Sequence, residues 1–83
     1  GNERIVAARG QVAFERGPIV YCFEQADQPI PATISSSARV AAKARPDLLG
    51  GVTVLEVDGA TAIPYYAWNN RGLAPMTVWV PVR

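Results

Sequence analysis

Turn-forming residues recur every eight to twelve positions along this chain and limit the length of any regular element. They lie at Gly10, 17–18, 29–31, 35–37, 46–47, 50–51, 58–59 and 69–72. Short segments bounded by glycine, proline, asparagine, aspartate and serine are typical of β-strands. The rhythm therefore predicts an all-β fold of about six to eight short strands with almost no helix. The most economical arrangement is a small antiparallel, jelly-roll-like β-sandwich.

Residues 11–16 and 19–24 are expected to form a first antiparallel hairpin. They flank Gly17 and a proline, and glycine readily adopts the positive φ of a tight turn. The second segment is apolar on both faces of a strand. One face carries Ile19, Tyr21 and Phe23, and the other carries Val20 and Cys22. Such a strand is expected to lie centrally, with material packed on each side.

Residues 52–57 and 60–63 are expected to form a second hairpin. Asp58 and Gly59 lie between them. This dipeptide is preferred in two-residue hairpin turns because both positions need a positive φ. Pro64 follows directly and removes a backbone hydrogen-bond donor, which predicts either a sheet edge or a bend.

The alternating segments 38–45 and 76–80 are expected to be strands as well. In the first, one face carries Ala38, Val40, Ala42 and Ala44, and the other carries Arg39, Ala41, Lys43 and Arg45. Alanine favours helix, but the period of two and the following Pro46 outweigh that preference. Basic residues of the chain number eight against seven acidic ones and are scattered. The basic face of this strand is therefore interpreted as a solvated edge, and no nucleic-acid partner is predicted.

The chain is too short to build a large core. A domain of 83 residues buries only about 60% of the surface that its unfolded chain exposes. Cys22 has no disulfide partner, and the sequence has no histidine for a structural zinc site. With 49% hydrophobic residues, the chain is expected to leave apolar surface for a neighbouring domain or subunit to cover.

The candidates for catalysis are weak. Glu56 and Asp58 flank a hairpin tip and are expected to be exposed, whereas a catalytic acid usually has a raised pKa. Glu15 and Glu24 lie near opposite ends of a predicted hairpin and are not expected to meet. Cys22 lacks the histidine, helix N-terminus or metal that would activate a thiolate, so a buried structural role is favoured. No catalytic, cofactor-binding or metal-binding residue is predicted in this chain.

Residues 63–72 carry the densest group of aromatics. On an exposed strand, Tyr66 and Trp68 would share a face and could stack on a sugar ring. If buried, Tyr65, Tyr66 and Trp68 would anchor the core or a partner surface, which is the favoured reading. Arg71 follows in a predicted turn and is a candidate contact to another domain or, more commonly, a solvated side chain. The isolated chain is expected to self-associate as a homodimer through an aromatic face that includes Trp68.

The sequence has no membrane span, since no stretch approaches about eighteen uninterrupted apolar residues. No secretory signal is visible. The chain begins at Gly1 and holds its only methionine at Met76, so it is interpreted as a segment of a larger protein, with Gly1 a possible tag remnant. An unpaired cysteine suits a reducing compartment and favours the cytoplasm, although the parent's compartment is not encoded here.

Two segments resemble the C-terminal region of glycoside hydrolase family 127, which includes β-L-arabinofuranosidases. The first is Q-V-A-F-E-R-G-P-I-V-Y-C-F-E at residues 11–24, similar to a family run of the type V-A-L-Q-R-G-P-L-V-Y-C-L-E. The second is A-I-P-Y-Y-A-W-N-N-R-G at 62–72, followed by M-T-V-W-V-P at 76–81. P-D-L-L-G-G-V-T-V-L at 46–55 fits between them. One departure is the tight turn at 58–59, where relatives tend to carry a longer insertion.

The resemblance implies a parent glycoside hydrolase with an (α/α)6 barrel that carries an acid/base glutamate, a cysteine nucleophile and zinc. β-Sandwich domains follow that barrel, and the chain resembles only such a sandwich. Cys22 belongs to the sandwich run and is not the family's catalytic cysteine. The chain is therefore expected to be a non-catalytic accessory domain over residues 1–83 that supports the barrel or pairs subunits. A carbohydrate-binding module that uses Tyr66 and Trp68 is the alternative.

Overall fold

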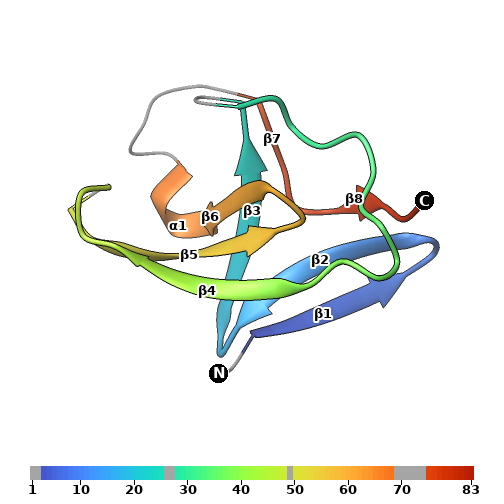
Figure 1. Ribbon diagram of the computed structural model, residues 1–83, viewed down its shortest axis with the longest axis horizontal. Coiled ribbons are helices and arrows are strands. Elements are labelled where there is room, and N and C mark those ends of the chain that lie inside the picture. Colours follow the sequence, from blue (N-terminus) through green and yellow to red (C-terminus); the bar gives the residue numbers. More distant parts are fainter. Residues whose placement is uncertain (1–2, 26–27, 49, 69–74) are drawn as a thin grey trace.

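The computed structural model describes residues 3–25, 28–48, 50–68 and 75–83 (Figure 1). The described residues form eight strands and one short helix. They are β1 (Glu3–Ala8), β2 (Gln11–Arg16), β3 (Ile19–Glu24), β4 (Val40–Arg45), β5 (Val52–Val57), β6 (Ala60–Pro64), α1 (Tyr65–Trp68), β7 (Met76–Thr77) and β8 (Val80–Pro81). The prediction of a nearly all-β fold of short strands is confirmed. A search of these residues finds no helix long and apolar enough to span a bilayer.

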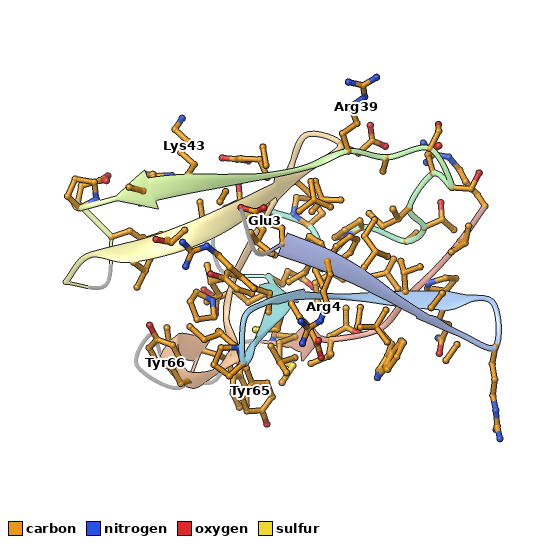
Figure 2. All side chains as sticks on the ribbon, turned by 90° about the horizontal axis from the view of Figure 1, so that it is seen from below. Glu3, Arg4, Arg39, Lys43, Tyr65 and Tyr66 are labelled. Carbon is orange, nitrogen blue, oxygen red and sulfur yellow. The ribbon has the colours of Figure 1, made fainter. Side chains whose placement is uncertain are left out.

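The strands form one antiparallel sheet in the order β1-β2-β3-β6-β5-β4, with β7 beside β3 and β8 beside β2. This sheet curls until its two end strands, β1 and β4, contact each other. Figure 2 shows the result, in which β4 and β5 form one layer and β1 and β2 form the other. The fold is therefore a small β-sandwich made from one curled sheet.

Both predicted hairpins are present. In β2–β3, Glu15 pairs with Val20, and Gly17 has a φ of 57° in the turn between the strands. In β5–β6, Asp58 and Gly59 have φ values of 51° and 86°. Both residues of the second turn thus adopt the left-handed conformation that a two-residue hairpin of this kind requires.

Strand β3 is central and apolar on both faces, as predicted. On its inner face, Tyr21 and Phe23 are buried, and the Phe23 ring meets the Phe14 ring edge to face at a centroid distance of 5.9 Å. On its outer face, Cys22 is buried in a second cluster with Val54 and Ile63. The sheet therefore carries two apolar clusters, one inside the curl and one outside it.

The inner face is least covered along the seam between β1 and β4. Paired residues of an antiparallel sheet point to the same face. Ile5 pairs with the buried Phe14, and Ala42 pairs with the buried Leu55, so both belong to the inner face. Nevertheless Ile5 is 48% exposed, and Ala42 is also exposed. The sandwich is therefore incompletely closed along this seam.

Three features differ from the sequence predictions. Strand β1 has no counterpart among the predicted strands, and β4 begins at Val40 instead of residue 38. The strand predicted over 76–80 is divided, because β7 pairs with β3 whereas β8 pairs with β2. Pro64 ends β6 inside the sheet and marks a bend into α1, which is one of the two outcomes predicted for it.

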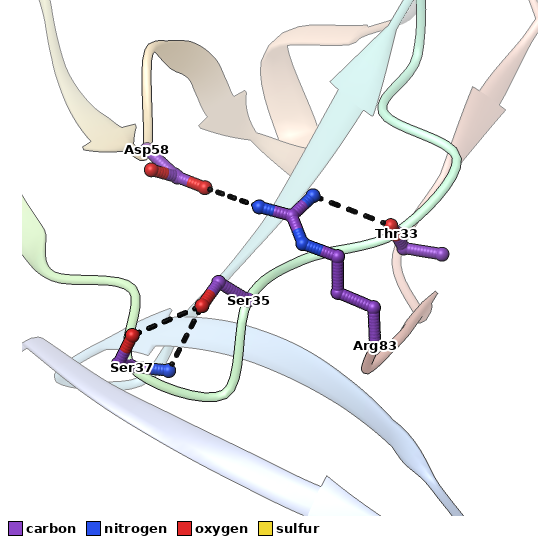
Figure 3. A network of polar contacts seen from close by, with 5 residues as sticks. All are labelled: Thr33, Ser35, Ser37, Asp58 and Arg83. Atoms are coloured by element: carbon purple, nitrogen blue, oxygen red, sulfur yellow. Dashed lines mark hydrogen bonds and ion pairs between the residues drawn. The ribbon is translucent and has the colours of Figure 1, made fainter.

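The C-terminal residues are fastened to the segment before β4 (Figure 3). Ile34 forms a parallel bridge with Val82, and the Ile34 amide donates to the Pro81 carbonyl oxygen at 2.9 Å. The Arg83 guanidinium lies 3.4 Å from an Asp58 carboxylate oxygen and 3.5 Å from the Thr33 hydroxyl oxygen. These exposed side-chain contacts add little stability, so the backbone bridge is the main fastening.

Candidate interaction surface

The aromatic run does not continue as a strand after Pro64. Residues 65–68 form one helical turn, α1. Proline cannot donate to the next rung of the sheet, and its fixed φ is compatible with the start of a helix. Two residues separated by two positions lie about 200° apart around a helix axis. The predicted platform, with Tyr66 and Trp68 on one strand face, is therefore wrong.

Trp68 packs onto the outer face of the sheet. Its half-buried ring joins the partly buried residues that cover the Cys22, Val54 and Ile63 cluster. The Tyr65 ring lies against it at a centroid distance of 6.2 Å with an interplanar angle of 50°. Trp68 therefore serves the chain's own packing, which is the core alternative considered for it.

Tyr65 and Tyr66 are exposed beside Trp68. The two residues are 47% and 63% exposed, and both side chains point away from the sandwich (Figure 2). They border an open groove of about 500 Å³. Its other walls are apolar and consist of Pro18, Ile19, Val20 and Val78. We call this feature the apolar groove.

A second groove adjoins the first at the mouth of the curled sheet. Its walls come from β2 to β6, α1 and the turn after β4, and we call it the arginine groove. It is lined by Arg16, Ile19, Tyr21, Ala44, Arg45, Pro46, Gly51, Val52, Thr53, Pro64 and Tyr66. Ile19 and Tyr66 border both grooves. The two grooves therefore form one continuous surface on either side of the Tyr66 ring.

The floor of the arginine groove is rigidly held. The buried Tyr21 hydroxyl donates to the Thr53 carbonyl oxygen at 2.7 Å. Burial raises the pKa of Tyr21, and the positive charge of Arg16 opposes that rise. The phenol thus stays protonated near neutral pH and acts as a structural donor, while the Arg16 guanidinium lies within electrostatic reach of it.

Cys22 does not have the properties of a nucleophile. Its side chain is fully buried, and its pKa is raised to about 11, first by burial and then by the negative charge of Glu24. A thiol with this pKa is protonated near neutral pH, and the thiolate is the reactive form. The predicted burial of Cys22 is confirmed.

The carboxylates considered for catalysis are dispersed. Glu15 accepts a 2.8 Å hydrogen bond from the Arg4 guanidinium beside the β2–β3 turn, whereas Glu24 lies at the other end of β3. Glu56 accepts from the Thr61 hydroxyl at 2.9 Å. Within the described ranges, no group of three or more His, Cys, Asp or Glu side chains is placed to hold a metal ion.

The structure reveals surface residues that the sequence patterns did not single out. Trp79 is 39% exposed at the crossing between β7 and β8. Arg16 lies at the end of β2, where the alternating pattern predicts burial of Val12 and Phe14. Nothing in that pattern marks Arg16 as part of a groove. Arg71, considered as a contact to another domain or, more commonly, a solvated side chain, lies outside the described residues.

Comparisons with known proteins give a consistent result. Residues 1–81 match the glycoside hydrolase family 127 C-terminal domain. A non-reducing end β-L-arabinofuranosidase of Bifidobacterium longum subsp. longum is 32% identical over 94% of this chain. The alignment spans 112 positions, more than the 83 residues of the chain, so the matched region of that relative is longer. The match covers 17% of the relative's own length.

Solved structures agree with this match. A family 127 β-L-arabinofuranosidase from Geobacillus stearothermophilus T6 superposes with a TM-score of 0.84 at 32% identity, over 98% of this chain and 18% of that one. A second family 127 β-arabinofuranosidase gives a TM-score of 0.85 at 33% identity, over 98% of this chain and 17% of that chain. The chain thus spans about one sixth of the length of these relatives.

Proposed function

Because the chain belongs to the glycoside hydrolase family 127 C-terminal domain family, we propose that it is a non-catalytic accessory β-sandwich of a longer β-L-arabinofuranosidase-like enzyme. Its role is to pack against the catalytic barrel or to pair subunits. The buried, protonated Cys22 and the dispersed carboxylates support a role other than catalysis. The zinc ion that the family resemblance implies is assigned, as part of the proposal, to the catalytic barrel outside this chain.

The observation that carries the proposal is the apolar groove. Tyr65 and Tyr66 are exposed beside Val20 and Val78, on the face of the sheet that Trp68 covers only in part. Tyrosine gives a large contact area at small entropic cost and is enriched at protein interfaces. Covering this groove with the rest of the enzyme removes apolar surface from water, which favours association.

Nitration of tyrosines by tetranitromethane tests the proposal. In the isolated chain, Tyr65 and Tyr66 react, whereas the buried Tyr21 serves as an internal unreactive control. In the longer parent enzyme, Tyr66 is expected to be protected. If Tyr66 reacts at the same rate in the parent and in the isolated chain, the apolar groove is not a docking surface.

A second candidate function, carbohydrate binding, is favoured by the high exposure of one ring. Tyr66 is 63% exposed beside a groove of a size that accommodates a sugar residue. In this alternative, Tyr65 and Tyr66 contact the sugar. Binding would change the fluorescence of Trp68, because its ring lies against the Tyr65 ring. Titration with arabinose-containing oligosaccharides, followed by tryptophan fluorescence, separates the two functions. The accessory-domain proposal predicts no change at millimolar sugar.

A further inference from the structure

Arg16 occupies an unusual position at the mouth of the curled sheet. It follows Phe14 by two residues in β2, so it belongs to the inner face. Its Nε atom is buried and has no hydrogen-bond partner among the residues that the structure describes. A buried donor without an acceptor destabilises the folded state, because it loses its hydrogen bonds to water and gains none in the protein. A hydrogen-bond acceptor brought close to this Nε–H would therefore stabilise the Arg16 side chain.

The lining of the arginine groove is positively charged. Among the residues that line the arginine groove, Arg16 and Arg45 carry charge and none is acidic. Asp47 binds Arg45 through two contacts of 3.1 Å, but this exposed pair is of the kind that contributes little and exchanges readily. Glu3 faces Arg16 across the β1–β2 register and lies outside the groove lining.

We propose that the arginine groove receives an aspartate or glutamate side chain from the part of the parent enzyme outside this chain, and that Arg16 binds its carboxylate. This inference rests on the proposed docking function. A guanidinium is the side chain best suited to a carboxylate, because its planar fork donates two parallel hydrogen bonds. Arg16 turns slightly toward the groove in this arrangement, and its Nε gains the acceptor it lacks.

The continuity of the two grooves argues for a protein side chain as the source of the carboxylate. Ile19 and Tyr66 border both grooves, so a domain seated on the apolar groove also reaches the arginine groove. The relatives extend far beyond the matched region, which covers only 17–18% of them. A uronic acid would present the same carboxylate on a sugar, and the experiment below distinguishes that source.

The test is a titration of the 83-residue chain with propionate, a mimic of the glutamate side chain, followed by the ¹H–¹⁵N resonance of the Arg16 Nε–H. Propionate is expected to shift this resonance saturably, whereas propionamide at equal concentration leaves it unchanged. Glucuronate is expected to bind no more tightly than propionate. Amide spectra of each variant verify that the fold is intact.

Three variants sharpen the result. In Arg16→Gln, the groove amides of Gly51 and Thr53 are expected to lose their response, with apparent affinity falling about tenfold or more. Arg39→Gln, which removes an exposed cation just before β4 and outside the groove, is expected to behave as the wild type. Arg16→Lys keeps the charge without the fork and is expected to be intermediate.

Specific outcomes overturn the inference. Equal shifts with propionate and propionamide would show that no carboxylate site exists. So would an equal loss of propionate affinity in Arg16→Gln and Arg39→Gln. Glucuronate binding at least about tenfold tighter than propionate would assign the groove to an acidic sugar. Nitration of Tyr66 is independent of the carboxylate. If Tyr66 is protected from nitration in the parent but the Arg16 Nε–H resonance does not respond to propionate, this inference is overturned and the proposed docking function stands.

Discussion

The two faces of β3 differ in what covers them. The inner face, with Tyr21 and Phe23, is enclosed by strands of the same chain, and both side chains are 1% exposed. The outer face is covered around Cys22 by Trp68 and residues of β7, but beside Val20 it opens into the apolar groove. The chain thus has enough material to close one face of its central strand and only part of the other.

This difference connects stability with function. A small domain has little apolar material to spare, so large residues left at its surface need an explanation. Tyr65 and Tyr66 are not isolated on the surface but border a groove that adjoins the incompletely covered outer cluster. We infer that the inner face stabilises the domain and that the outer face serves association.

The largest effect is expected from truncation on the inner face. Phe23→Ala removes a ring buried against Phe14 and should lower the free energy of unfolding by about 3–5 kcal/mol, or abolish folding. Urea unfolding measures the loss. Phe23→Leu is the control and should cost less, because it leaves a smaller cavity. A cost of Phe23→Ala below about 1 kcal/mol would show that the inner cluster is not the main source of stability.

A smaller effect is expected from titration of Cys22 at the outer cluster. The thiol pKa is about 11 in the folded chain against an ordinary value of 9.0, so the folded state holds the proton more tightly. This contribution is fully present below pH 9 and lost as the pH rises through 11. The wild type should lose about 2 kcal/mol more than Cys22→Ala over that interval. Parallel urea melts of the two proteins measure the difference, and identical pH profiles would contradict the burial of the thiol.

Truncation of Trp68 is expected to have a moderate effect on the isolated chain. Its half-buried ring covers the outer cluster from the chain's own side, so Trp68→Ala should cost about 1–2 kcal/mol. Trp68→Phe, which keeps an aromatic ring, is the matched control. If Trp68→Ala left stability unchanged but abolished a wild-type dimer in sedimentation, Trp68 would belong to the association surface and not to the packing of the chain.

The smallest effect on the isolated chain is expected at Tyr66. With 63% of the residue exposed, Tyr66→Ala should change the free energy of unfolding by less than about 0.5 kcal/mol. Chemical denaturation of the two proteins side by side suffices as the measurement. A cost comparable to that of Trp68→Ala would mean that Tyr66 already packs on its own domain, and the contrast between the two faces would disappear.

The sequence allowed prediction of features that depend on local chemistry. The positive φ at Gly17 and at Asp58–Gly59 follows from the turn residues, and the two-sided character of β3 follows from its uninterrupted apolar pattern. The division of the last strand was not predictable in this way. Residues 76–80 alternate regularly, yet β7 and β8 pair with different strands, which is decided by tertiary contacts.

The candidate surface was predictable only in part. The aromatic run marks Tyr65, Tyr66 and Trp68 as notable residues, but the helical turn after Pro64 separates Trp68 from Tyr66. A four-residue turn is too short for a helical period to show in the sequence. The arginine groove joins residues of β2, β3, β4 and β5, and Arg16 meets them only through the curl of the sheet. No local pattern encodes that meeting.

The most direct test of the central claim compares Tyr66→Ala in the isolated chain and in the longer parent enzyme. We expect the substitution to be nearly silent in isolation but to lower the free energy of unfolding of this domain by about 2 kcal/mol or more in the parent, where we propose that Tyr66 is covered. Hydrogen exchange of the β3 amides, measured as a function of urea concentration, reports the unfolding of this domain separately from the rest of the larger protein. An equally small cost in both settings would contradict the claim that the outer face is completed by a partner.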